Sequence, residues 1–122
     1  MVNRHRGEIA ADLNGKTYTL CLTLGALAEI ESAYGDQDML AIAERFEKGR
    51  ISARDAIRVI GAGLRGAGNA IGNDEVATMS VAGGAAGFIA IVVKLLTATF
   101  APPGEPPGNG EAPPAQNSPG GA

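Results

Sequence analysis

The chain has 122 residues, one cysteine, no tryptophan and a formal net charge of −3. This length fits one domain, and a lone cysteine excludes a disulfide framework and a cysteine-based metal site. A slightly acidic chain with 4% aromatic residues also lacks the basic surface with stacking aromatics that is typical of nucleic-acid-binding modules.

Residues 7–21 predict a tight β-hairpin, because Asn14-Gly15 is the strongest short-range hairpin signal. A two-residue turn at this pair places Leu13 opposite Lys16 and Ile9 opposite Leu20. One face then collects the apolar side chains of Ile9, Ala11, Leu13, Tyr18 and Leu20. A two-stranded ribbon is marginal alone in water, so this face must rest on helices of the chain or on another subunit.

The apolar spacing after the hairpin predicts helices over about 24–34, 37–48, 53–65, 74–81 and 85–99. The expected N-caps are Thr23, Asp36 or Asp38, Ser52 and Asn73, whose side chains can accept from free backbone N–H groups. Ser52 and Asp55 match a capping box, with Asp in place of the more usual Glu. Gly35 and Gly49 are expected to follow the ends of the first two helices.

Glycines interrupt the pattern around the end of the third helix. Gly61 and Gly63 each cost up to about 1 kcal/mol relative to Ala inside a helix, so we expect another backbone to approach closely there. Residues 66–73 are expected to form a flexible loop. The GxGxxG-like spacing in this region does not predict a dinucleotide site, because it ends a helix and does not join a strand to a helix.

The last predicted helix has an apolar arc about twice as wide as the stripe of a typical surface helix. We therefore expect one flank to pack under the hairpin and the other to contact a partner or a second copy, without the pattern deciding between the flanks. The candidate partner-binding residues are Phe88, Ile89, Ile91, Val93, Leu95, Leu96 and Phe100.

The C-terminal segment differs in composition from the rest of the chain. All seven prolines lie between Pro102 and Pro119, and residues 101–122 have no large apolar side chain. We expect a disordered Pro/Gly-rich tail over 101–122 and one domain over 1–100. The predicted fold class is α+β, with an N-terminal antiparallel β-hairpin followed by four or five short helices.

The titratable side chains give little sign of an active site. Cys21 lies next to a predicted strand, where a small half-buried side chain is the simpler interpretation, and His5 lies in a charged N-terminal segment. Arg54, Arg58 and Arg65 share one face of the third helix, which fits a solvated face or a phosphate-binding or partner-binding stripe. No catalytic residue, cofactor or metal ligand is predicted.

Two features bear on location. The apolar run from Ala85 to Phe100 contains Lys94 and is too short to span a bilayer. The first eight residues lack the apolar run of a signal peptide, so a soluble, cytoplasmic protein is expected.

Three segments together resemble a known family: LTLGALAEIE (22–31), ERFEKG (44–49) and SARDAIRVIGAGLRGAG (52–68). With the NGK hairpin and the closing apolar helix, they are similar to the small protein of the tail gene cluster of gene transfer agents and related prophage-like elements. The resemblance covers about residues 3–100 and contains no catalytic signature.

This resemblance implies a non-enzymatic role in tail assembly. The first interpretation is a chaperone that binds the tape-measure protein, since helices with excess apolar surface suit helix-in-groove binding. The alternative is a structural tail (tube) subunit incorporated into the particle, in which case the protein would also be found there. The partners that the resemblance implies are the tape-measure protein or other tail proteins. The apolar arc of the last helix separately suggests a homo-oligomer, and the charge and helix length predict no nucleic-acid or membrane partner. A small DNA-binding regulator using the arginine stripe is a further alternative.

Overall fold

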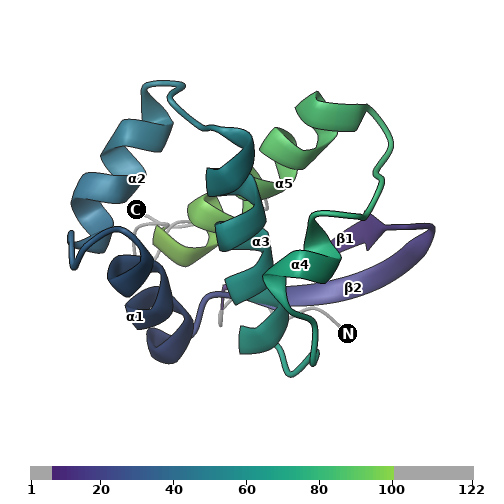
Figure 1. Cartoon of the computed structure of the whole chain (residues 1–122), viewed down its shortest axis with the longest axis horizontal. Coiled ribbons are helices and arrows are strands. Elements are labelled where there is room, and N and C mark those ends of the chain that lie inside the picture. The colour runs from purple at the N-terminus through teal and green to yellow at the C-terminus, as the bar shows by residue number, and fades with distance from the viewer. Residues whose placement is uncertain (1–6, 101–122) are drawn as a thin grey trace, which may run out of the picture.

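The computed structural model describes residues 7–100, which form a β-hairpin and five helices (Figure 1). The elements in chain order are β1 (Glu8–Leu13), β2 (Lys16–Cys21), α1 (Leu24–Ala33), α2 (Met39–Glu47), α3 (Ala53–Gly66), α4 (Asn73–Val76) and α5 (Gly84–Phe100). The predicted α+β class is thereby confirmed. His5 and the predicted tail over 101–122 lie outside the described residues.

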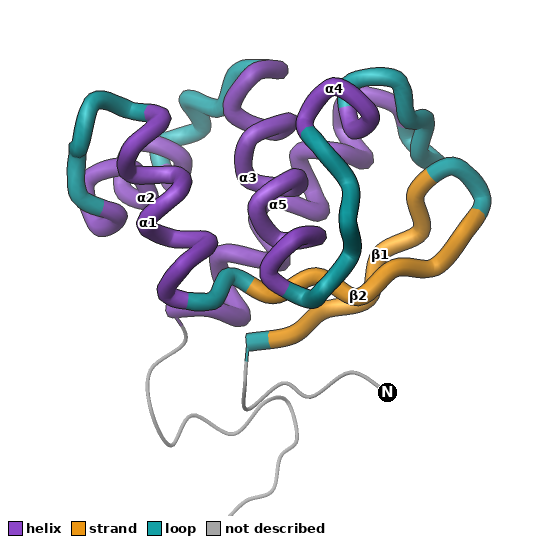
Figure 2. The backbone as a smooth tube through the Cα atoms, turned by 60° about the horizontal axis from the view of Figure 1, so that its bottom comes forward, coloured by secondary structure: helices purple, strands orange, loops and turns teal. Residues whose placement is uncertain are grey.

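The hairpin has the predicted antiparallel register, with Leu13 opposite Lys16 and Ile9 opposite Leu20. Asn14 and Gly15 have φ values of +57° and +76°, which a two-residue type I′ turn requires. The helices lie on one side of the hairpin (Figure 2), where α3 packs on β2 and α5 packs on β1. The apolar face is therefore covered by helices of the same chain.

Helix α3 lies at the centre of the domain, because it contacts β2, α1, α4 and α5. Its buried side chains meet those of the hairpin and of α5 in one continuous core. The largest side chains of this core are almost fully inaccessible, among them Leu13, Leu20, Ile60, Leu64 and Leu95. Burying each contributes about 1.5–3 kcal/mol relative to exposure.

Local capping fixes the helix starts largely as predicted. The side-chain oxygens of Thr23 and Asp38 accept from the N–H groups of Ala26 and Ala41, at 3.1 and 2.9 Å. The Ser52–Asp55 capping box is present with both of its hydrogen bonds. Gly35 and Gly49 follow the C-caps of α1 and α2 with positive φ, as C′ glycines do.

The prediction for the fourth helix was wrong in two respects, the residue that caps it and the length of the helix. Its N-cap is Gly72, not Asn73, and it ends at Val76, not near Val81. Beyond the helix, the Met79 side chain is buried in the core, and Ser80 forms hydrogen bonds with the hairpin turn. The Asn14 N–H donates to the Ser80 carbonyl at 2.8 Å, and the Ser80 N–H donates to Asn14 Oδ1 at 3.1 Å.

The expectation of a close backbone near Gly61 and Gly63 was also only partly right. A Cβ at Gly61 or Gly63 would meet the side chains of Asn73 or Leu95, whereas one at Gly66 would lie 2.1 Å from the Cys21 carbonyl oxygen. The backbone contact with β2 is therefore at Gly66.

The segment predicted to be a flexible loop is tied to the domain at several points. Asn69 Nδ2 donates to the carbonyls of Thr19 and Leu64, at 2.9 and 3.1 Å. The Arg65 guanidinium donates to the Ile71 carbonyl at 2.8 Å, and the Ile71 side chain is buried. These bonds hold residues 66–73 against α3 and β2.

Candidate functional site

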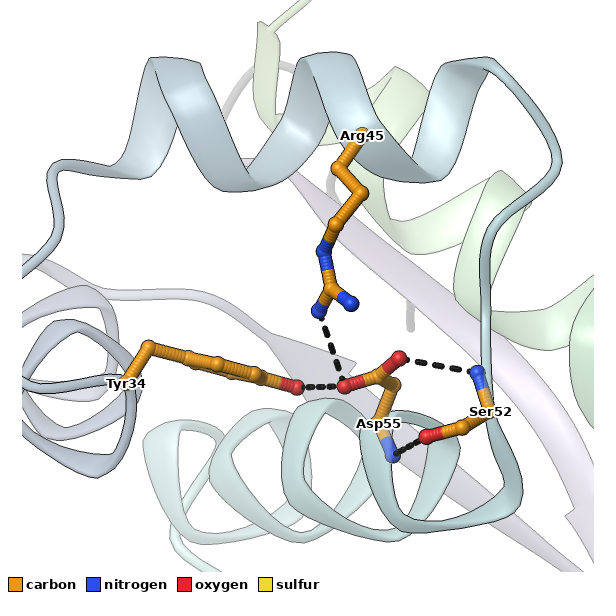
Figure 3. A network of polar contacts seen from close by, with 4 residues as sticks. All are labelled: Tyr34, Arg45, Ser52 and Asp55. Carbon is orange, nitrogen blue, oxygen red and sulfur yellow. Dashed lines mark hydrogen bonds and ion pairs between the residues drawn. The ribbon is translucent and has the colours of Figure 1, made fainter.

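A polar network joins α1, α2 and α3 around the carboxylate of Asp55 (Figure 3). Asp55 is 3% exposed. Its Oδ1 accepts from the Tyr34 hydroxyl and from Arg45 Nη2, the latter at 3.0 Å. Its Oδ2 accepts from the Ser52 N–H at 2.8 Å, while the Asp55 N–H donates to Ser52 Oγ at 3.1 Å. One carboxylate thus connects the C-terminus of α1, the end of α2 and the first turn of α3.

Aromatic and guanidinium groups surround this network. The Arg45 and Arg58 guanidinium carbons lie 5.4 and 5.0 Å from the centroid of the Tyr34 ring, within cation–π range. The Phe46 ring packs edge-on against Tyr34 at 6.4 Å. Every group around the carboxylate is a donor or an aromatic ring, without a nucleophile and base pair, so the arrangement suits a structural clasp rather than acid–base chemistry.

The hydrogen bonds set the protonation of the two acidic groups. Burial disfavours the charged form of Asp55, but donors from Ser52, Tyr34 and Arg45 outweigh it and lower the pKa of its carboxyl. Burial, followed by the adjacent Asp55 carboxylate, raises the pKa of the Tyr34 hydroxyl. The pair is therefore a carboxylate and a neutral phenol at neutral pH.

The lowered pKa of Asp55 predicts acid sensitivity. The unfolded chain takes up this proton near pH 4 and the folded chain only at a lower pH, so the stability that this group contributes is complete above about pH 5 and is lost as pH falls below about 4. Urea unfolding at pH 7 and pH 3 should show a smaller loss of stability for Asp55→Asn than for the wild type. Equal losses would contradict the prediction.

The other residues considered for chemistry are mostly engaged in structure. Cys21 is buried. Arg65 pairs with Glu29 of α1, and Arg58 stacks on Tyr34. Arg54 is exposed, so the predicted arginine stripe leaves one of its three members on the free surface. That distribution gives the DNA-binding alternative little support.

The seven candidate partner-binding residues of α5 divide between core and surface. Ile91, Leu95 and Leu96 are buried, and Phe88 and Ile89 are half-buried. Val93 is 49% exposed and Phe100 is 38% exposed. The flank with Ile91 and Leu95 therefore faces the core, and the flank with Val93 and Phe100 faces outward. Leu96 lies on the outward flank by helical spacing, but its side chain is buried.

An apolar pocket of about 340 Å³ adjoins the N-terminal end of α5. It is lined by α3 and the segment before it, by the end of α4 and the residue after it, and by α5. The lining residues are Ile51, Ala53, Ala56, Ile57, Val76, Ala77, Ala85, Phe88 and Ile89. Phe88 and Ile89 come from α5. Ile89 lies one turn before Val93 and joins the pocket to the outward flank, whereas Phe88 lies on the core-facing flank with Ile91. Sequence reasoning found these two residues but missed the α3 and α4 walls, because small alanines give no signal until the helices are placed together.

Within residues 7–100, no three His, Cys, Asp or Glu side chains gather where they could hold a metal ion. No helix of that part of the chain is long and apolar enough to cross a bilayer.

Comparison with known proteins assigns the chain to a family. Searches among curated proteins and among solved structures found no match. The model of the family described as "Phage tail tube protein, GTA-gp10" matches residues 6–102. This description agrees better with the structural-subunit alternative than with the chaperone interpretation drawn from the sequence. Because the match covers most of the chain, including the hairpin and all five helices, the chain belongs to the phage tail tube protein family GTA-gp10.

Proposed function

We propose that this chain is a non-enzymatic structural subunit of a phage-like tail of the gene-transfer-agent type, incorporated into the particle. The observation that carries the proposal is the family match over residues 6–102. The exposed flank of α5 and the adjoining apolar pocket support it, since contiguous apolar surface on a small domain marks a contact site for another protein.

Tail-assembly chaperone is the second candidate, and one observation favours it. The described residues contain a sheet of two strands beside five helices, whereas a tube subunit that builds a continuous β-sheet wall should be mostly β. A chaperone would instead use the apolar pocket and the outward flank of α5 to hold an amphipathic helix of the tape-measure protein.

Quantitative mass spectrometry of purified particles separates the two candidates. A structural subunit is expected in many copies per particle, in constant ratio to other tail proteins. A chaperone is expected to be absent or strongly sub-stoichiometric, and to raise the solubility of the tape-measure protein on co-expression. The first result supports the proposal, and the second overturns it.

A surface variant makes the particle test sharper. Val93→Asn changes the outward flank of α5 and is expected to leave the domain folded. A matched change at Lys94, to Gln, removes the neighbouring exposed charge and keeps the apolar flank. If the flank contacts other tail proteins, particles should lose the Val93 variant and retain the Lys94 variant.

A further inference from the structure

Helix α2 carries a large apolar side chain that the domain does not use. Leu40 is 72% exposed in the first turn of α2. Glu44 and Glu47 follow one and two turns later on the same face, and both are exposed. Asp36 and Asp38 precede it, also exposed. Leu40 thus shares its face of α2 with two exposed carboxylates, and the exposed Lys48 follows at the end of the helix.

Charged residues of both signs lie next to the pocket's lining residues in the sequence. On the α3 side, Arg50 and Arg54 flank the lining residues Ile51 and Ala53, and both arginines are exposed. On the α4 side, Asp74 and Glu75 precede the lining residue Val76 and are exposed as well. An acidic surface that covers the pocket should therefore lie against the α3 wall.

We propose that Leu40 of one copy occupies this pocket in the next copy, with Glu44 and Glu47 of α2 beside Arg50 and Arg54. A cavity of about 150 Å³ accommodates a benzene-sized group, so the pocket of about 340 Å³ has room for a leucine side chain. Charge complementarity between the face of α2 and the α3 wall selects a second copy over an arbitrary apolar partner.

The contact is head-to-tail, because the inserted side chain and the pocket lie on different parts of the surface. Each copy then contributes one leucine and one pocket, so the contact can repeat and form either closed rings or open chains of copies. The inference rests on the proposed function for its biological role, whereas its test uses purified full-length protein. A failure of one can therefore be told from a failure of the other.

Two kinds of variant block opposite sides of the contact. Leu40→Ser removes the inserted side chain, while Ala85→Leu fills the pocket from the α5 wall. Ala53→Leu fills it from the α3 wall, in case one filling variant disturbs the fold, and circular dichroism melts identify such a variant. Leu24→Ser is the matched control, because Leu24 is 85% exposed at the start of α1 and takes no part in the proposed contact.

Sedimentation velocity over a concentration series gives the readout. Wild type and Leu24→Ser are expected to associate equally, and each blocking variant to associate roughly tenfold to a hundredfold more weakly. A mixture of Leu40→Ser and Ala85→Leu should restore a one-to-one dimer that cannot grow, since one copy keeps its pocket and the other its leucine.

Charge reversal tests the orientation. Glu44→Arg and Arg54→Glu should each weaken association, and the double variant should recover most of the loss. The proposal is overturned if the wild type stays monomeric, which would leave the pocket to a different protein. It is equally overturned if Leu24→Ser abolishes association in place of Leu40→Ser, or if the blocked variants fail to pair when mixed.

Discussion

Leu95→Asn is expected to lower the free energy of unfolding by about 4 kcal/mol, because it leaves a cavity and buries an amide among apolar side chains. Leu95 is 0% exposed, and one of its methyl groups lies 2.7 Å from the position that a Cβ on Gly63 would take. Urea unfolding followed by circular dichroism measures the change.

The control for this variant lies two residues earlier on the same helix. Val93→Asn introduces the same side chain at a site that is 49% exposed, so we expect a loss below about 1 kcal/mol. Leu96 would be a poor control, because it is 9% exposed and belongs to the core. Similar losses at 93 and 95 would mean that α5 is enclosed on both flanks, and the partner surface would have to lie elsewhere.

Asp55→Ala is expected to cost about 3 kcal/mol, because it leaves Tyr34, Arg45 and the Ser52 N–H without their shared acceptor. Three helices lose their common attachment together, so the cost should exceed that of an ordinary helix cap. Thermal and urea unfolding at pH 7 measure it.

Ser52→Ala serves as the matched variant. It removes one hydrogen bond of the capping box and keeps the carboxylate with its other partners, so we expect a loss of about 1 kcal/mol. If Asp55→Ala were no worse than Ser52→Ala, the carboxylate would act as a local cap only, and the contacts with Tyr34 and Arg45 would add nothing to stability.

Local sequence signals predicted the parts of the fold that depend on neighbours in the chain. Asn14-Gly15 predicted the turn and the register, and Thr23 and Ser52 predicted helix starts, since each acts within about four residues. Asp55 was recognised as half of a capping box. Its partners Tyr34 and Arg45 are 21 and 10 residues away, and no periodicity links positions so far apart.

The surface features likewise depend on residues that are far apart in the sequence. The wide apolar arc of α5 predicted that two flanks would have different environments, but which flank faces the core depends on where α3 and β1 lie. The arginines of α3 looked like one stripe because helical spacing ignores the Glu29 and Tyr34 side chains of α1, which engage Arg65 and Arg58. The pocket required three helices to be placed before it could be seen.

The bond between Asn14 and Ser80 has a consequence for the order in which the domain is built. The two residues are 66 positions apart, and β1 packs on α5, the last described element. During synthesis the N-terminal strand emerges first, but its buried face meets its cover only when α5 has been made. Helix α3 can cover β2 earlier, but the apolar side of β1 must wait for α5. The hairpin is marginal alone, so we expect folding to be completed late, as one cooperative event.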